Sequence, residues 1–488
     1  MSWDATLAEL ERKRAFARSM GGAERIDKHH AGGKLDARQR AEALFDPGSF
    51  TEIGALAGNL SEGTPAPAPA DGLIAGYGLI DGRPALTGIE DFTVLGGSIG
   101  DASATKRYRL TQLAAQERLP LVFMLEGAGH RLTNAHSNPA PNDLQGLAAL
   151  SGLVPMVCLV MGASAGHGAL TAPLSDFVVM TSAASMFVAG PPIVKAAIGE
   201  SVTKEELGGP LVQLASGVAH NLAEDDAAAI TLARRYLGYF GAQSIAEGPR
   251  RLDAILHMVP PDPRFPFDVR PVIELMCDAG SVLEVQPVYG GALVTALARL
   301  GGKAVAIIAN NPVVNAGAVD AAAAQKAARF IDMADAHGLP LIFLTDNPGV
   351  QPGTASERAG MLRHAARMFA AQHRARVPKL HVTLRKAFGF GSSIMGMNPF
   401  DGQTLSLAFP AISLGAMPAG AGADSAGLSP EDKAKALASQ TASAWNLSSK
   451  MAYDDIIDPR DLRNALLGGL SLTANRPTSP RKMEGILP

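Results

Sequence analysis

Apolar segments alternate along this chain with charged, amphipathic segments, and several apolar segments end in a glycine-rich turn. The clearest case is residues 377–395, where the apolar stretch 377–384 predicts a buried strand and Gly389-Phe390-Gly391 follows as a turn. Small residues after the turn can open a helix. Such a turn presents backbone N–H groups at a helix N-terminus, which favours negative charge. A tight packing turn explains a single copy equally well.

The same pattern occurs earlier in the chain. Residues 154–172 carry Gly166-His167-Gly168 where the later copy carries Gly389-Phe390-Gly391, an offset of 389 − 166 = 223 positions. Residues 119–129 match residues 339–349 at an offset of 220. These offsets are far longer than the period of a repeat array, so the sequence predicts two homologous α/β domains.

The stretch 258–271 contains five prolines and is the clearest linker. We therefore expect the domains to be residues 1–257 and 258–488.

Within the first domain, Asp81-Gly82 predicts a hairpin turn between two strands. The turn at Gly96-Gly97 leads into a helix. Its Lys106, Arg107 and Arg109 could meet an anionic ligand, but we expect them to lie on a solvated face. The strand ending at Glu126 is followed by the loop Ala128-Gly129-His130. We expect backbone donors from Gly129 and His130 in this loop. His130 could also act as a general base, since histidine suits that work near neutral pH, but the sequence shows no partner to orient it.

Composition excludes several function classes. With 47% hydrophobic and 18% charged residues the chain has ample material for a core, and a net charge of −3 gives no reason to expect nucleic acid or an anionic membrane as partner. The longest apolar run is far short of the roughly 20 residues that span a bilayer. No secretory signal is visible, and the two cysteines lie in apolar segments without metal-ligand spacing. We expect a cytoplasmic protein without a metal.

Several motifs give the chain a specific resemblance. They include RIDKHHAGGKLDARQRAEALFDPGSF, DGRPALTGIEDFTVLGGSIGDASATK, ANNPVVNAGAVDAAAAQKAARF, DNPGVQPGTASE and VPKLHVTLRKAFGFG. Collinearly from about residue 20 to 415, the chain is similar to the carboxyltransferase (beta) subunits of biotin-dependent acyl-CoA carboxylases, most of all the propionyl-CoA and methylcrotonyl-CoA branch. The resemblance implies two crotonase (ClpP-like) β-β-α superhelix domains, the first on the acyl-CoA side and the second on the biotin side. It also implies a tight dimer with each active site between the first domain of one chain and the second of the other, and often a hexamer.

The implied reaction moves a carboxyl group from carboxybiotin to the α-carbon of an acyl-CoA. Backbone N–H groups can hold both oxyanions that develop, and the cofactor supplies the base, so the reaction requires no catalytic side chain. By motif, Gly129 with its neighbours Ala128 and His130 would hold the thioester oxygen, and Phe390 with Gly391 would hold the oxygen of biotin. The resemblance gives supporting roles in substrate or cofactor binding to Gly96, Gly97, Gly166, His167, Gly349 and Gly389.

No Met-Lys-Met biotinylation motif and no ATP-binding carboxylase segment is present. The biotin carboxylase and the biotin carrier are therefore expected to be separate chains.

The motifs depart from the family at the site. The family usually has Ser-Gly-Gly-Ala-Arg in the first loop, where this chain has Gly127-Ala128-Gly129-His130-Arg131. Its second turn is usually Gly-Gly-Ala-Tyr-Asp, so the final Asp, which is tied to acyl choice, is Ser393 here. Such substitutions leave the backbone N–H donors in place, but they change the shape of the pocket. The resemblance thus predicts the reaction class but not the acyl group. Decarboxylation or other thioester enolate chemistry, and a non-catalytic scaffold subunit, remain alternatives.

Overall fold

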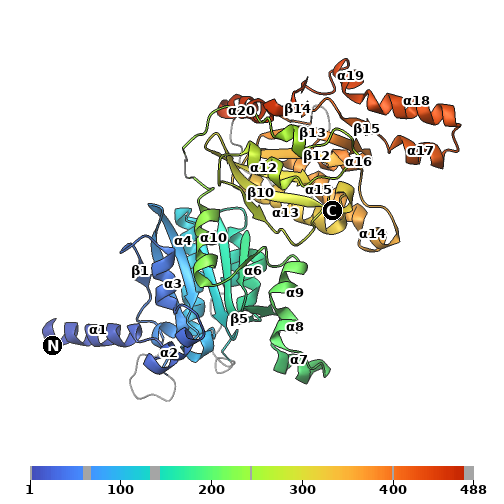
Figure 1. Ribbon diagram of the computed structural model, residues 1–488. Coiled ribbons are helices and arrows are strands. Elements are labelled where there is room, and N and C mark those ends of the chain that lie inside the picture. The colour runs from blue at the N-terminus through green and yellow to red at the C-terminus, as the bar shows by residue number, and fades with distance from the viewer. Residues whose placement is uncertain (1–2, 59–66, 132–142, 242–244, 398–400, 477–488) are drawn as a thin grey trace. The chain divides into compact units, whose positions relative to one another are not determined.

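The computed structural model describes residues 3–58, 67–131, 143–241, 245–397 and 401–476. The chain forms two compact units, Met1–Phe240 and Gly241–Pro488 (Figure 1). This division lies before the proline-rich stretch from which the sequence places the boundary at 257/258. The reason is packing, since Leu252 and Ile255 belong to the hydrophobic core of the second unit. Arg250 also donates hydrogen bonds to the backbone carbonyls of Leu275 and Cys277.

The first unit is built on one sheet with the strand order β1-β2-β3-β4-β5-β6-β8, in which β7 pairs with the end of β5. The strands β1 to β3 are antiparallel, and the pairs from β3 to β8 are parallel. The strands are β1 (Thr51–Ile53), β2 (Leu73–Ile80), β3 (Arg83–Glu90), β4 (Leu121–Gly127), β5 (Met156–Ala165), β6 (Phe177–Thr181), β7 (Ser185–Phe187) and β8 (Asn221–Ala223). The predicted hairpin is confirmed, because Asp81 and Gly82 connect β2 to β3 and both have positive φ.

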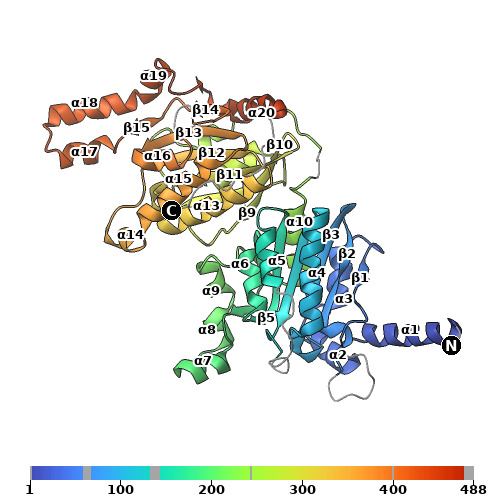
Figure 2. The ribbon, with the colours of Figure 1, turned by 180° about the vertical axis from the view of Figure 1, so that it is seen from behind.

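Helices cover both faces of this sheet. The described α-helices are α1 (Trp3–Arg18), α2 (Ala23–Ala31), α3 (Ala37–Leu44), α4 (Asp101–Glu117), α5 (Asp143–Leu150), α6 (Thr171–Leu174), α7 (Pro191–Ile198), α8 (Lys204–Gly208), α9 (Pro210–Ala215) and α10 (Asp226–Leu237). Helices α4 and α5 bury apolar residues in a core that includes Val178 of β6. The preceding residue, Phe177, stacks instead on Tyr236 of α10 at 4.6 Å. The opposite views of Figures 1 and 2 show these two helical layers. Because both faces are covered, β4 is apolar almost throughout.

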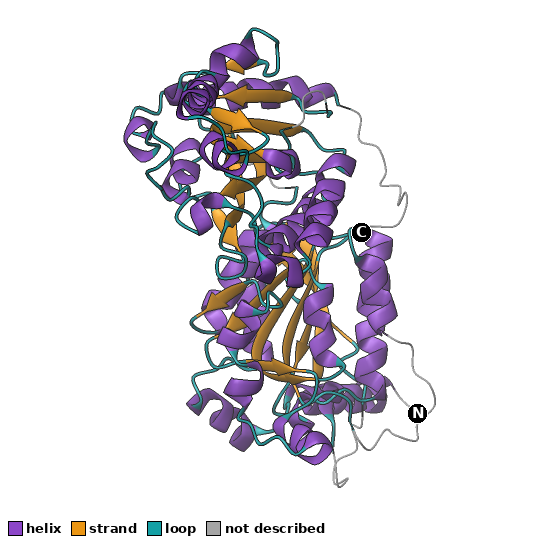
Figure 3. Ribbon diagram, turned by 90° about the vertical axis from the view of Figure 1, so that its right-hand side faces the viewer, coloured by secondary structure: helices purple, strands orange, loops and turns teal. Residues whose placement is uncertain are grey.

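The second unit repeats this sheet in the order β16-β14-β13-β12-β11-β10-β9, with β15 paired to β13. Its strands are β9 (Leu283–Val285), β10 (Leu293–Leu300), β11 (Lys303–Asn310), β12 (Leu341–Asn347), β13 (Lys379–Phe388), β14 (Leu405–Ala408), β15 (Ser413–Gly415) and β16 (Asp455–Ile456). Its described α-helices are α11 (Ile255–Met258), α12 (Arg270–Met276), α13 (Ala321–Ala336), α14 (Thr354–Arg358), α15 (Met361–Arg374), α16 (Gly389–Ile394), α17 (Ala419–Ser425), α18 (Pro430–Thr441), α19 (Ser443–Ser448) and α20 (Leu462–Leu472). Figure 3 shows the layered helices and strands of each unit.

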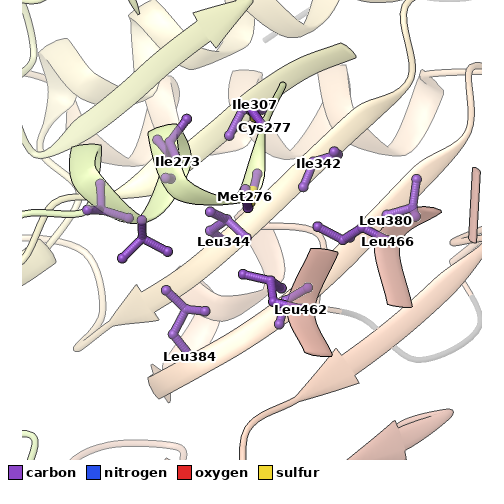
Figure 4. Close-up of a cluster of buried hydrophobic side chains, with 14 of the residues drawn as sticks. Ile273, Met276, Cys277, Ile307, Ile342, Leu344, Leu380, Leu384, Leu462 and Leu466 are labelled. Atoms are coloured by element: carbon purple, nitrogen blue, oxygen red, sulfur yellow. The ribbon is translucent and has the colours of Figure 1, made fainter. Parts of the chain in front are cut away.

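The predicted duplication is confirmed at the level of strand register. Leu121 faces Met156, and the residues 220 and 223 positions later, Leu341 and Lys379, face each other. The register of both pairs shifts just before the ends of β4 and β12. In the second unit the core gathers Met276 of α12, Leu466 of α20 and the strands between them (Figure 4). The fold is therefore α/β with two similar, mainly parallel sheets, and the same loops follow corresponding strands.

Candidate functional site

The loop after β4 is held by backbone hydrogen bonds to the segment that precedes α4. Ile99 N donates to Gly129 O at 2.8 Å, and Arg131 N donates to Ile99 O at 2.9 Å. In this parallel bridge the N–H of His130 points away from Ile99. Gly129 has a φ of +81°, and a Cβ built on it would stand 2.8 Å from Ala165 O. Only glycine fits here without a shift of the backbone.

The amides of this region differ in what they bind. Ala128 N donates to Gly96 O at 3.0 Å, Gly97 N donates to Val94 O at 3.0 Å, and Gly166 N donates to Phe187 O at 3.1 Å. These three amides are therefore committed to the protein's own backbone. For the amides of Gly129 and His130, the described part of the chain contains no acceptor.

His167 follows β5 and is held by a buried carboxylate. Its Nε2 lies 2.5 Å from Oδ1 of Asp143, the first residue of α5. Arg107 Nε donates to Asp143 Oδ2 at 2.6 Å, and Arg107 Nη2 donates to Thr171 Oγ1 at 2.6 Å. Burial alone raises the pKa of Asp143, but hydrogen bonds from His167 and Arg107 outweigh it and hold the pKa at about 2. Asp143 is thus a carboxylate at neutral pH.

The expectation that Lys106 and Arg107 lie on a solvated face is wrong. Both side chains are buried. Arg107 is paired with Asp143 and also lies 3.3 Å from Glu90. Lys106 donates to the carbonyls of Ala70 and Leu73, and burial lowers its pKa to about 8. Long cationic side chains can be buried in this way when carboxylates or carbonyls surround the charge.

The two histidines suggested by the sequence come together. The rings of His130 and His167 are edge to face, with centroids 5.1 Å apart. His130 is exposed, whereas the His167 side chain retains 20% exposure. The candidate site of the first unit therefore combines two amides that no described residue binds with an imidazole that a carboxylate orients.

A basic cavity of about 430 Å³ lies near the end of β4. Its lining includes Arg25, Lys28, His29, Lys34 and Glu126. Glu126 partly neutralises this set, since it is paired with Lys34 and with the buried Arg40. A second, apolar cavity of about 360 Å³ borders Gly166 and is lined by residues such as Leu170, Met186, Phe187 and Val218.

In the second unit, the loop after β12 and the first turn of α16 are joined by Asn347. Its Oδ1 accepts from Gly349 N at 2.8 Å, and its Nδ2 donates to Gly391 O at 2.8 Å. A Cβ on Gly391 would stand 2.7 Å from Gly349 Cα, so the two backbones are in close contact. The structure thus brings together Gly349 and Gly391, which the sequence assigns to one site.

The predicted turn from strand to helix is confirmed at α16. Gly389 has a φ of +57°, and a Cβ on it would stand 3.0 Å from Ala416 O. The helix has no side-chain cap, and the first amides of an α-helix lack acceptors within the helix. The backbone amides of Phe390 and Gly391 lie in this first turn of α16. The Phe390 side chain is 48% exposed.

The two units use corresponding loops differently. Val319 N donates to Gly349 O and Gln351 N donates to Val319 O, which repeats the bridge made by Ile99. The amide of Gly349 is bound by the Asn347 side chain, however. In the first unit Gly127 stands in place of Asn347 and has no side chain that could bind the amide of Gly129. Within the described residues, the loop of the first unit therefore has amides without an acceptor, whereas in the second unit the candidate donors are the amides of α16.

The described residues show neither a metal-binding cluster nor a membrane-spanning helix. Among the described residues, no three histidine, cysteine, aspartate or glutamate side chains gather as metal ligands would. No helix within those residues is long and apolar enough to cross a membrane.

Comparison with known proteins identifies the family. The sequence profile of the carboxyl transferase domain matches residues 28–486. The chain belongs to the carboxyl transferase family. This is the family of the carboxyltransferase subunits of biotin-dependent acyl-CoA carboxylases.

Two relatives align with nearly the whole chain. The methylmalonyl-CoA carboxyltransferase 12S subunit of Propionibacterium freudenreichii subsp. shermanii is 35% identical, over 99% of this chain and 97% of its own length. The methylmalonyl-CoA decarboxylase subunit alpha of Veillonella parvula is 34% identical, over 96% of this chain and 95% of its own.

A solved structure has the same fold. The transcarboxylase 12S crystal structure with methylmalonyl-coenzyme A and methylmalonic acid bound superposes with a TM-score of 0.92 at 34% identity, covering 100% of this chain and 99% of that one. The predicted fold of two crotonase-like domains and the predicted family are thereby confirmed.

Sequence reasoning missed several residues at the site. Asp143 and Glu90 lie 36 and 17 positions from Arg107 in the sequence, and no motif indicates that their carboxylates contact Arg107. Asn347 carries a weak signal, because it ends β12 and only one proline separates it from Gly349.

Proposed function

We propose that this chain transfers a carboxyl group between carboxybiotin and the α-carbon of an acyl-CoA. The observation that carries the proposal is the pair of unbound amides, Gly129 and His130, at a loop that the duplicated fold repeats beside α16. Charge develops on the thioester oxygen when the α-carbon becomes nucleophilic, and fixed N–H donors stabilise that charge without reorganising.

In the first unit the residues divide into donors and supports. Gly129 and His130 would donate to the thioester oxygen. Ala128, Gly97 and Gly166 would shape the loop, because their own amides are already bound. Gly96 would fix the loop through the carbonyl that accepts from Ala128. His167 would border the acyl group.

In the second unit, Phe390 and Gly391 would donate to the ureido oxygen of biotin from the first turn of α16. Gly389 makes the sharp entry to that turn, and Asn347 ties Gly391 to Gly349. Bound biotin supplies the carboxyl group that is transferred. What this chain supplies is a set of oriented donors, which suits a small neutral group carrying one oxygen that gains charge.

The cavities of the first unit fit the remaining parts of an acyl-CoA. Arg25, Lys28 and Lys34 line the basic cavity, which suits the phosphates of coenzyme A. The apolar cavity beside Gly166 has room for an acyl chain longer than propionyl. We propose that the acyl group packs there.

The expected partners are a biotin carboxylase, a biotin carrier chain and further copies of this chain. The transcarboxylase 12S structure is described as a hexamer assembly, and we propose a hexamer built from dimers here too. We also propose a cytoplasmic location.

Phe390 offers a test of the donors in α16. Phe390→Pro removes the N–H at the second position of the helix, where proline fits. Phe390→Ala is the matched control because it keeps the N–H. With biocytin and methylmalonyl-CoA as probes, we expect Phe390→Pro to lower the biotin-dependent rate about 10²–10³-fold and Phe390→Ala to change it only a few fold. Equal rates for both variants would exclude this amide as a donor.

One second candidate has specific support. A relative that covers nearly the whole chain is named as a subunit of a decarboxylase. The same amides would stabilise the enolate that forms when a carboxyacyl-CoA loses its carboxyl group. Turnover that does not depend on biotin would favour this function.

A further inference from the structure

The Asp143–His167 pair has the geometry of an oriented base. Asp143 is almost fully buried, with 1% of its side chain exposed, and its position is fixed by Arg107 on the side away from His167. His167 retains 20% exposure. A buried carboxylate behind a partly exposed imidazole holds the ring in one orientation and one tautomer.

The tautomer follows from the charge on Asp143. Since the pKa of Asp143 is held at about 2, its carboxylate can only accept a hydrogen bond, and His167 Nε2 must donate it. In the neutral ring the lone pair is then on Nδ1. The described residues provide no hydrogen-bond partner for Nδ1.

This imidazole lies next to the loop that carries the Gly129 and His130 amides. The position at which Gly129 would carry a Cβ is 2.8 Å from the carbonyl of Ala165, two residues before His167. The ring of His130, whose amide is one of the two donors, packs edge to face on the ring of His167. An acyl thioester held by these amides would therefore lie beside His167.

We propose that His167 is a general base for the α-proton of an acyl thioester held by the Gly129 and His130 amides, with Asp143 as its positioning residue. This inference rests on the proposed function. It adds a side chain to a reaction for which backbone donors and the cofactor otherwise suffice.

The proposed step is balanced within the site. The Cα–H bond breaks and its proton passes to His167 Nδ1. The electron pair moves into the thioester to form an enolate, whose oxygen accepts hydrogen bonds from Gly129 and His130. The reverse step returns a proton to Cα. In D₂O the imidazolium exchanges its proton with solvent, so repeated enolisation places deuterium on Cα without any carboxyl donor.

Several charged or titratable groups surround His167. Asp143 on α5 is paired with His167, and Arg107 on α4 is paired with the same carboxylate. His130 lies on the loop after β4. Glu90 on β3 contacts Arg107, and burial raises its pKa to about 7. Because the raised pKa of Glu90 lies near neutral pH, the test compares variants and does not rely on a single pH profile.

The experiment is deuterium incorporation into propionyl-CoA, followed by mass spectrometry, with the full-length protein in D₂O and no biotin. We expect the unaltered protein to catalyse exchange and His167→Gln to lower the exchange rate about 10²–10⁴-fold. The matched control is His257→Gln, an exposed histidine on α11, which should exchange at the unaltered rate. Thermal melting of each variant checks that it is folded.

Asp143→Asn separates positioning from packing. We expect slower exchange with an unchanged KM for propionyl-CoA, because the ring of His167 loses the carboxylate that orients it. A raised KM with an unchanged rate at saturation, or exchange as fast as in the unaltered protein, would contradict the positioning role of Asp143.

The outcomes distinguish this inference from the proposed function. Biotin-dependent carboxyl transfer without exchange, or exchange that His167→Gln leaves intact, overturns the role of His167 while the transferase remains. A folded protein that shows neither exchange nor transfer overturns both.

Discussion

Gly129→Ala tests the loop of the first unit most sharply. Gly129 has a φ of +81°, so alanine there costs roughly 1–2 kcal/mol of conformational energy. In addition, the new Cβ would stand 2.8 Å from Ala165 O, a contact that only a shift of the loop can relieve. The amides of Gly129 and His130 move with the loop. Loss of one such donor lowers the rate about 10²–10³-fold, or roughly 2.7–4 kcal/mol in the barrier.

Gly199→Ala is the matched control. Gly199 has a φ of +75°, but nothing lies within 4 Å of the position its Cβ would take. Both variants should lower the melting temperature by several degrees, since about 1 kcal/mol corresponds to roughly 2–4 °C in a unit of this size. Only Gly129→Ala should also lower kcat for biotin-dependent decarboxylation of methylmalonyl-CoA. A Gly129→Ala variant that melts like the control and keeps its kcat would refute the assignment of these donors.

Three further predictions follow from the remaining contacts. Asn347→Ala should destabilise the protein by about 1–3 kcal/mol in a denaturant titration and slow carboxyl transfer, because it removes the hydrogen bonds to the partly buried Gly349 amide and the buried Gly391 carbonyl. Unchanged stability would contradict the bridging role. Lys34→Met should raise KM for the acyl-CoA with little change in kcat, and it should weaken the salt dependence of KM. An unchanged KM would exclude the basic cavity as the binding site of the coenzyme A phosphates. Asp143 should stabilise the fold above about pH 4 and lose this effect as the pH falls toward 2, because its folded-state pKa is lowered; acid titration of Asp143→Asn should lack that loss.

The duplication made much of the fold predictable. Hydrophobic stretches repeated at offsets of 220 and 223 identify β4 with β12 and β5 with β13, and the glycines mark the turns that follow. Glycine is informative here because positive φ and close backbone contact are requirements of the chain itself, as at Gly129 and Gly391.

The buried charges were not predictable in the same way. From the sequence, Arg107 is predicted to lie on the exposed face of an amphipathic helix. Only the three-dimensional fold brings Glu90 and Asp143 into contact with it. The unit boundary differs for a related reason. A stretch rich in proline suggests a linker, but Leu252 and Ile255 pack into the second unit before the prolines begin. Which residues pack together depends on partners distant in sequence.

The reverse reaction tests the central claim most directly. The full-length protein would be incubated with malonyl-, methylmalonyl- and longer carboxyacyl-CoAs, with and without free biotin, and loss of the carboxyl group followed. The proposed transferase predicts turnover that requires biotin and extends to acyl chains longer than propionyl. Turnover without biotin would contradict carboxyl transfer and favour the decarboxylase. No turnover across the whole panel by a folded protein would contradict acyl-CoA as the substrate.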